Sequence, residues 1–140
     1  MIYDAAAMKQ ITVKTSQRTE FIEITGEVQS AVESWGLEEG VVTVYVPHTT
    51  AGVAINEHAD PDVMRDVDQV LDQCVPWNGP YRHAEGNTAA HVKAIMTGSS
   101  VQLIVEASAL RLGTWQGVFF CEFDGPRTRH VWITSVRTRA

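Results

Sequence analysis

The stretch GVVTVYVPHTTAGVAINEHADP, residues 40–61, is the part of the sequence that decides the fold. Its opening run, GVVTVYV, is rich in β-branched and aromatic residues and predicts a strand, which Pro47 ends. Residues 51–55 predict a second short strand. Asp60-Pro61 then predicts the start of a helix, because aspartate is a good helix cap and proline suits the first helical position.

Upstream of this stretch, the pattern predicts one or two strands within residues 9–24 and then a helix. Thr25 is a suitable helix cap, apolar side chains recur after it at helical spacing to about residue 35, and Gly36 is a suitable stop. Downstream, the helix that begins at Pro61 is expected to run to about Cys74. Its expected buried face consists of Val63, Val67, Val70, Leu71 and Cys74.

The rest of the chain predicts one further helix and three strands. The helix fits Thr88–Thr97, capped by Asn87 and ended by Gly98. A DGP turn at residues 124–126 predicts that the last two strands form a hairpin. Because the helices cluster mid-chain between groups of strands, we expect a single α+β domain over residues 1–140, a largely antiparallel β-sheet sandwich with about three helices. The three expected strands cover residues 100–107, 114–123 and 129–136.

Composition and charge exclude several classes of function. Of the 140 residues, 44% are hydrophobic and 20% are charged, which suffices for a core without disulfides. The formal net charge of -6 argues against non-specific nucleic-acid binding. A signal peptide and an apolar membrane-spanning run are not expected, so we predict a cytoplasmic protein without membrane partners. Cys74 and Cys121 lie in apolar patterns and are expected to be buried free thiols.

Three histidines, His48, His83 and His91, lie at the ends of predicted elements or in a loop, where binding residues usually lie. His91 falls in the first turn of a predicted helix, whose partial positive charge favours a neutral imidazole and a neighbouring anion. Three imidazoles can also hold a catalytic zinc ion. Spacing alone leaves three interpretations open: a metal site, structural histidines, and acid–base catalysis without a metal.

Carboxylates and other polar residues surround these histidines in the sequence. Glu57, Asp60 and Glu85 could complete a metal shell, orient an imidazole or act as a general base, although Asp60 also has the role of a helix cap. Asn56 precedes the same helix start, where side chains are exposed. His58 is expected to be a surface or structural residue, as is His130 in its predicted strand.

Two segments near predicted turns have both a structural and a ligand-binding interpretation. Gly98-Ser99-Ser100 is suited to ending a helix, and its amides and hydroxyls could also hold a phosphate. Trp115 could pack in the core or form a pocket wall, with Gln116 as a polar anchor. The arginines near the end of the chain fit solvated strand faces, or a contact with an anion or another subunit. They are Arg127, Arg129, Arg137 and Arg139.

Four segments of the sequence carry a family resemblance. They are HTTAGVAINEHADPDV at 48–63, GPYRHAEGNTAAHVKA at 79–94, MTGSSV at 96–101 and LGTWQGVFFCEFDGPR at 112–127. These segments resemble the YjbQ-like, or UPF0047, proteins, which are also called the secondary thiamine-phosphate synthase family. The resemblance extends from about Met8 to the end of the chain. It implies a YjbQ-like α+β fold, a homotrimer with its site in a cleft near subunit contacts, and a histidine cluster associated with bound metal or anions.

The resemblance also implies an activity. The family is linked to a secondary thiamine-phosphate synthase reaction, which joins a hydroxymethylpyrimidine diphosphate to a thiazole phosphate and releases pyrophosphate. Such a reaction needs a metal or cations to neutralise the leaving group, and a pocket that excludes water. We therefore expect a metal-dependent enzyme that acts on a small phosphorylated or anionic metabolite. The alternative is a non-catalytic anion-binding or regulatory homotrimer that uses the same cleft.

The expected roles of individual residues follow from these motifs. The ligands of a divalent metal, with zinc as the expected ion, are His48, His83 and His91. The expected catalytic residues are Glu57, Asp60 and Lys93. The expected substrate- or anion-binding residues are Asn56, Ser99, Ser100, Trp115 and Gln116.

Overall fold

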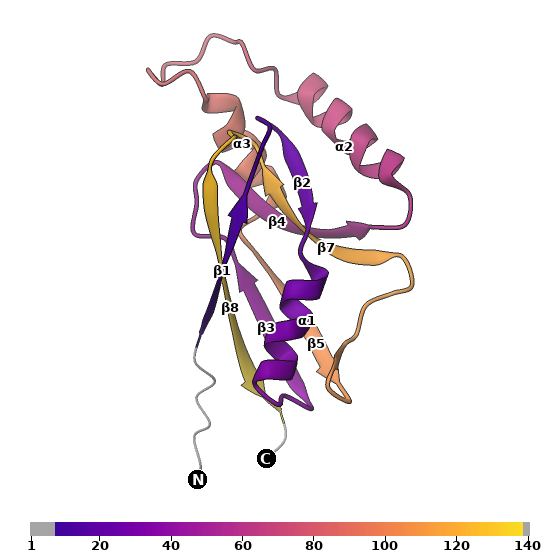
Figure 1. Ribbon diagram of the computed structural model, residues 1–140. Helices are drawn as coiled ribbons and strands as arrows, with labels where there is room; N and C mark the ends of the chain where they lie inside the picture. The colour runs from indigo at the N-terminus through magenta and orange to yellow at the C-terminus, as the bar shows by residue number, and fades with distance from the viewer. Residues whose placement is uncertain (1–7, 139–140) are drawn as a thin grey trace.

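The computed structural model describes residues 8–138 and is built from two antiparallel sheets and three helices (Figure 1). The strands are β1 (Lys9–Lys14), β2 (Glu20–Glu23), β3 (Gly40–Tyr45), β4 (Ala51–Glu57), β5 (Ser100–Glu106), β6 (Ala109–Leu110), β7 (Gln116–Glu122) and β8 (Thr128–Arg137). The helices are α1 (Thr25–Ser34), α2 (Pro61–Cys74) and α3 (Thr88–Thr97). The expected α+β fold with antiparallel sheets is confirmed.

The strands form a large sheet and a small sheet. The large sheet has the order β1-β8-β3-β5-β6, and the small sheet has the order β2-β7-β4. Every strand pair is antiparallel. The chain passes between the two sheets several times, and two of these crossings border the same pocket: β3–β4 runs from the large to the small sheet, and β7–β8 runs from the small to the large sheet.

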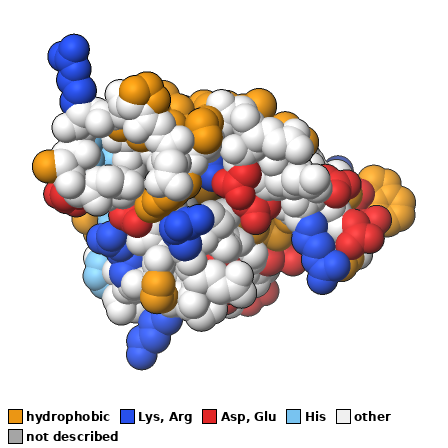
Figure 2. Space-filling view, turned by 90° about the horizontal axis from the view of Figure 1, so that it is seen from above, with side chains coloured by type: hydrophobic (Ala, Val, Ile, Leu, Met, Phe, Trp, Pro, Cys, Tyr) orange, Lys and Arg blue, Asp and Glu red, His pale blue; other side chains and the backbone are white. Residues whose placement is uncertain are grey.

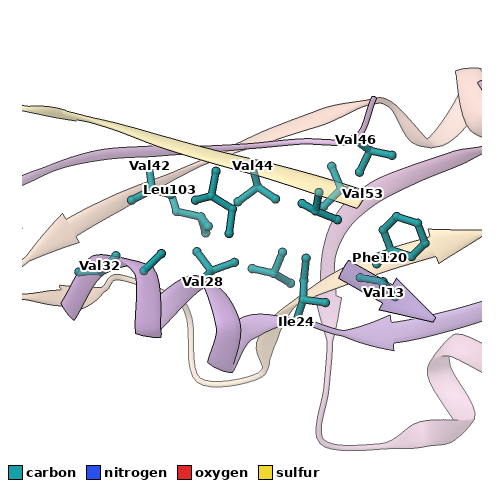
Figure 3. Close-up of a cluster of buried hydrophobic side chains, with 14 of the residues drawn as sticks. Val13, Ile24, Val28, Val32, Val42, Val44, Val46, Val53, Leu103 and Phe120 are labelled. Carbon is teal, nitrogen blue, oxygen red and sulfur yellow. The ribbon is translucent and has the colours of Figure 1, made fainter. Parts of the chain in front are cut away.

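The main core lies between the large sheet on one side and α1 with the small sheet on the other. The predicted stripe of α1 is confirmed, because Val28, Ala31 and Val32 are buried. Figure 3 shows Val28 and Val32 directed toward strand residues such as Val44 and Leu103. Each fully buried side chain of this size contributes about 1.5–3 kcal/mol through removal of apolar surface from water.

A second cluster lies on the other face of the small sheet, beneath α2 and α3. It contains Met64, Ala90, Ala94, Phe119, Cys121 and Phe123. The predicted buried face of α2 is partly wrong: Met64 is the buried residue of this helix, Val70 is 54% exposed and Cys74 is exposed. The reason is that α2 packs against the narrow, three-stranded sheet, which cannot cover a full apolar stripe.

Local signals at the helix ends were mostly reliable, except that Asn87, the predicted cap of α3, makes no capping hydrogen bond with its side chain. Gly36 and Gly98 follow α1 and α3 with positive φ angles of 61° and 100°, which glycine adopts without strain. Asp60 caps α2 by accepting a hydrogen bond from the amide of Asp62 at 2.9 Å. Thr25 is not the cap of α1 but its first residue, because its hydroxyl accepts the amide of Val118 on β7 at 2.9 Å.

The predicted hairpin between the last two strands is wrong. β7 belongs to the small sheet and β8 to the large sheet, so residues 123–127 connect two sheets rather than two paired strands. Gly125 packs closely against the segment that links β1 to β2, so that a Cβ at this position would overlap the carbonyl oxygen of Gln17. The turn residues were recognised correctly, but the choice of partner strand depends on segments far away in the sequence.

No helix among residues 8–138 is long and apolar enough to span a membrane. Of the four arginines singled out in the sequence, Arg139 lies outside the described residues.

Candidate functional site

His48, His83 and His91 line one pocket of about 780 Å³, here called the histidine pocket. His48 follows β3, His83 lies between α2 and α3, and His91 lies in the first turn of α3. Figure 2 views the end of the molecule where α2 and α3 lie and shows histidine side chains beside Lys or Arg at one edge. The pocket is also lined by Tyr45, Val46, Pro47, Thr49, Thr50, Glu85, Asn87, Ser99, Asp124, Arg127, Arg129 and Trp132.

The topology explains why these distant segments meet. The β3–β4 crossing carries His48, and the β7–β8 crossing carries Asp124 and Arg127. Both crossings lie at the same end of the sandwich, beside the amino end of α3. A hydrogen bond of 2.8 Å from the Nδ2 of Asn87, at the start of α3, to Asp124 joins the helix to the second crossing.

His48 is held by the backbone of β8. Its Nε2 accepts a hydrogen bond from the amide of His130 at 2.9 Å, and the two rings are stacked with centroids 6.4 Å apart. Burial lowers the pKa of His48, and the charges of Arg129 and His130 lower it further. The imidazole is therefore neutral near pH 7, and because Nε2 is an acceptor, its proton resides on Nδ1.

His83 and His91 form a pair. Their ring centroids are 5.3 Å apart, and the rings are nearly perpendicular at 88°. The Nε2 of His83 lies 4.0 Å from a carboxylate oxygen of Glu85, which lines the same pocket. Imidazole and carboxylate groups at this spacing can exchange protons with a bound ligand or share a divalent cation after small side-chain rotations.

The three histidines do not form a finished metal site. Among residues 8–138, no three His, Cys, Asp or Glu side chains are grouped closely enough to hold a metal ion. The chemistry of His83, His91 and Glu85 fits zinc, whereas His48 could coordinate through Nε2 only after losing its bond to His130. The donor set therefore suits a metal at the His83–His91 pair better than one shared by all three histidines.

Behind the pocket lies an ion pair that the sequence did not reveal. Arg129 is 3% exposed and Glu122 is 0% exposed, and the Nε of Arg129 donates to the carboxylate at 2.9 Å. The Nη2 of Arg129 also donates to Glu122 and to the hydroxyl of Thr50. Burial alone would raise the pKa of Glu122, but hydrogen bonds from Arg129, the amide of Asp124 and Thr15 outweigh it and lower the pKa.

A signal for this pair does exist in the sequence. Glu122 interrupts the apolar run VFFCEF, and Arg129 occupies an inward position of a strand whose next inward positions are apolar. A charged residue at a core position is expected to be paired. In the sequence, Arg129 belongs with the other arginines near the end of the chain, for which either solvated strand faces or a contact with an anion or another subunit is expected. Burial of Arg129 in an ion pair was not among these expectations.

The residues of the NExxDP run lie apart from the histidine pocket. Glu57 and Asp60 line a second pocket of about 300 Å³, together with His58 and Glu23. Asp60 serves as the α2 cap, and a carboxylate oxygen of Glu57 accepts the amide of the nearby Ala59 at 3.0 Å. The Oδ1 of Asn56 accepts the amide of Glu57 at 2.8 Å. The structure thus does not bring these three residues together with the histidines.

His58 and Glu23 form an ion pair in this second pocket, with Nδ1 and Oε2 2.9 Å apart. The hydrogen bond that His58 donates to the carboxylate of Glu23 raises the pKa of His58. Burial acts to raise the pKa of Glu23, but the bonds from His58 and Thr25 outweigh it, and the net pKa is lowered. His58 thus has a structural partner, in agreement with its surface or structural interpretation.

The remaining predicted residues divide between the two environments. Ser99 lines the histidine pocket, and Ser100 begins β5 with its side chain exposed. Lys93 is 2% exposed and forms an ion pair with Asp72 rather than lining that pocket. The ion pair with Asp72 explains how a lysine is tolerated at this buried helix position.

The GTWQG segment forms an exposed turn before β7. Trp115 is 63% exposed, so its interpretation as a core residue is wrong. Gln116 closes the turn by accepting the amide of Gly113 at 2.8 Å. Their ligand-binding role stays a prediction.

The two cysteines differ. Cys121 is a buried free thiol, as expected, and burial raises its pKa to about 12. Cys74 is exposed, so the expectation of a buried thiol is wrong for this residue.

Comparison with known proteins assigns the family. The sequence profile of the UPF0047 protein YjbQ-like family matches residues 9–138. This chain belongs to the UPF0047 family. Among its relatives, UPF0047 protein YugU of Bacillus subtilis is 50% identical over 127 residues, covering 90% of this chain and 96% of the relative. A UPF0047 protein of Methanocaldococcus jannaschii is 44% identical over 121 residues, covering 86% of this chain and 88% of the relative.

Solved structures of this family agree with the fold. An uncharacterized conserved protein of the YjbQ/UPF0047 family from Clostridium acetobutylicum has a TM-score of 0.90 and 50% identity, covering 91% of this chain and 99% of that chain. A hypothetical protein from Aeropyrum pernix K1 has a TM-score of 0.89 and 37% identity, covering 93% and 98%. The UPF0047 assignment and the YjbQ-like fold expected from the sequence motifs are therefore confirmed.

Proposed function

We propose that the histidine pocket binds a small phosphorylated or anionic metabolite. The observation that carries this proposal is the convergence of His48, His83 and His91 with two arginines on one pocket of about 780 Å³. This volume lies within the usual range of small-molecule sites, roughly 300–1,000 Å³. The Nδ1–H of His48 and the guanidinium groups of Arg127 and Arg129 supply donors for an oxyanion.

We further propose that the protein is an enzyme with a secondary thiamine-phosphate synthase activity. His83 and His91 are the candidates for proton transfer, because their rings are adjacent and border the pocket. The same pair, with Glu85 as a further ligand, is the proposed site of a zinc ion. When bound, such an ion would neutralise negative charge on a phosphate or diphosphate leaving group.

A non-catalytic anion-binding or regulatory protein is the second candidate. It is favoured by one observation: Glu57, Asp60 and Lys93, the expected catalytic residues, do not line the histidine pocket. Without them, the pocket has the features of a binding site but fewer groups for bond cleavage.

In either case we propose a homotrimer with subunit contacts near the pocket. Ile95 and Met96 on α3 are 83% and 55% exposed, an apolar surface that a second copy could cover. The free thiols of Cys74 and Cys121 suit the reducing environment of the cytoplasm, where we place the protein.

The proposed function is tested by metal analysis followed by product analysis. Protein refilled with zinc and freed of excess metal is expected to retain close to one equivalent per chain. Replacing both His83 and His91 with alanine should abolish retention, whereas His58→Ala, outside the histidine pocket, should not. Retention below about 0.2 equivalents in the unmodified protein would exclude the metal.

Binding and turnover are then separated. Calorimetry with phosphorylated metabolites should detect a ligand, and chromatography of the same mixtures should detect a product if the protein is an enzyme. Tight binding without a product would favour the second candidate, and no binding of any anion would refute both.

A further inference from the structure

Arg129 lines the histidine pocket although it is almost completely buried. Its side chain is 4% exposed and is held by Glu122, whose side chain is 0% exposed. One edge of the guanidinium, Nε and Nη2, is fully used in bonds to Glu122, and Nη2 also donates to Thr50. Within residues 8–138, its third nitrogen, Nη1, has no hydrogen-bond partner in the protein.

The position of this guanidinium is fixed by the groups around Glu122. One carboxylate oxygen accepts the hydroxyl of Thr15 at 2.8 Å, and the other accepts the amide of Asp124 at 3.0 Å. Arg129 therefore cannot swing toward solvent without leaving a buried carboxylate unpaired, which is strongly unfavourable. A donor held in this way is preorganised, so binding a ligand costs little side-chain entropy.

A second fixed donor borders the same pocket. The amide of His130, the residue after Arg129, occupies Nε2 of His48 and so leaves Nδ1–H as the ring's donor. The guanidinium and the imidazole are near one another, because both residues line the pocket and Arg129 also donates to Thr50, two residues after His48. Thr49, next to His48, and Ser99, just before β5, bring hydroxyl-bearing residues to the pocket.

We infer that Arg129 and His48 form a phosphoryl-binding subsite, in which the free Nη1 of Arg129 and Nδ1–H of His48 donate to oxygens of the same group. This inference rests on the proposed function of the pocket and assigns the contact that recognises its ligand. Donors come from β8, from the β3–β4 crossing and from Ser99 just before β5, which provides enough donors for several oxygens of one phosphoryl group. Glu122 neutralises Arg129 in the free protein and so makes the burial of a cation tolerable.

The acidic residues of the pocket do not oppose this subsite directly. Asp124 is paired with Arg127 at 2.9 Å and accepts from Asn87 at 2.8 Å, so its charge is compensated. Glu85 lies by His83. The pocket is thus divided into a phosphoryl end at β8 and a histidine–carboxylate end at α3, where the rest of the ligand would lie.

The inference is tested with inorganic phosphate as the probe, in the presence of a metal chelator. Because Arg129→Gln alone would leave Glu122 buried and unpaired, the informative variant is Arg129→Gln with Glu122→Gln, which removes both charges and keeps polar side chains of similar size. The matched control, Arg65→Gln with Asp62→Asn, removes an exposed arginine–carboxylate pair outside the pocket. Folding of both variants is checked by thermal melting and by amide NMR spectra.

We expect saturable phosphate binding to the unmodified protein and shifts of the His48 and Arg129 side-chain resonances on titration. Arg129→Gln combined with Glu122→Gln should weaken binding by about ten-fold or more, the change expected when a hydrogen bond to a charged group is lost. The control should bind like the unmodified protein. Unchanged binding by the folded pocket variant would overturn the subsite and leave the proposed function standing.

Two further outcomes separate the subsite from the proposed function. Phosphate binding that occurs only after zinc is added would overturn the Arg129 subsite but support a metal-based anion site at His83 and His91. Absence of phosphate binding both with and without zinc, together with no binding of phosphorylated metabolites, would overturn the subsite and the proposed function together.

Discussion

Replacing one partner of the buried ion pair between Arg129 and Glu122 should destabilise the protein far more than replacing both partners. Arg129→Gln leaves the carboxylate of Glu122 at 0% exposure with donors from Thr15 and the amide of Asp124 but without its countercharge. Loss of one partner of a buried pair costs roughly 3–5 kcal/mol. At about 2.1 cal/mol/K per residue of unfolding entropy, this lowers the Tm by about 10–20 °C for a chain of this length.

The double substitution, Arg129→Gln with Glu122→Gln, should cost only about 0–2 kcal/mol, because no charge remains unpaired. Urea denaturation of the protein, both single variants and the double variant provides a thermodynamic cycle, and the costs above give an expected coupling of at least about 4 kcal/mol. Single-variant costs below about 1 kcal/mol, or additivity within about 0.5 kcal/mol, would refute the assignment of a tight buried pair.

The buried ion pair should also make the free energy of unfolding depend on pH. The pKa of Glu122 is lower in the folded protein than its ordinary value of 4.5, so its contribution to stability is present above that pH. The contribution is lost as the pH falls through the folded pKa. The free energy of unfolding of the double variant should therefore decline less steeply below pH 4.5 than that of the unmodified protein. Equal slopes would mean that Glu122 has the same pKa in both states.

Three other measurements test the placement of individual residues. Lys93→Met should leave phosphate affinity unchanged, because Lys93 does not line the histidine pocket. It should alter the unfolding free energy by less than about 1.5 kcal/mol, because the side chain of Asp72 that is left behind is 60% exposed and remains solvated. Lost phosphate binding would restore the catalytic assignment of Lys93. NMR titration should place the pKa of His58 above 6.5, and Glu23→Gln should lower that pKa. The contribution of the His58–Glu23 pair to stability is present below pH 6.5 and is lost as the pH rises through the folded pKa of His58. The contribution is also lost as the pH falls through the lowered pKa of Glu23. Gly52→Ala should destabilise the protein by about 1–3 kcal/mol, because the added Cβ would lie 2.6 Å from the carbonyl oxygen of Gly98, just after α3. Gly26→Ala has open space around it and should stabilise α1 slightly. Equal effects at the two glycines would contradict this packing.

Features governed by neighbouring residues were predicted well. Helix α3 has the predicted bounds, Thr88–Thr97, and α2 starts at Pro61 as its cap and proline require. These signals succeed because a cap or a φ angle depends on atoms only a few residues away. The pairing of β7 with β8 failed because a turn sequence specifies a bend but not which sheet the following strand joins.

The candidate site was predictable in part for the same reason. His48, His83 and His91 were singled out because they lie at element ends, and the structure places all three around one pocket. Glu57 and Asp60 were associated with them through proximity in the sequence, yet they line a different pocket. Arg129 has a signal in the sequence, its place at an inward position of an apolar strand, but only the structure shows that it pairs with Glu122 and lines the pocket.

The sequence by itself was enough to predict the helices and most of the strands, to recognise the family, and to select His48, His83 and His91 as candidate site residues. Periodicity, capping and motifs depend only on short stretches of the chain. Only the tertiary structure decided which residues share a pocket. Two of the crossings between the sheets, β3–β4 and β7–β8, bring His48 and Arg127 to the amino end of α3. The long strand β8 supplies both Arg129 and the amide that orients His48. Such proximity depends on long-range strand pairing, which no local stretch of sequence encodes.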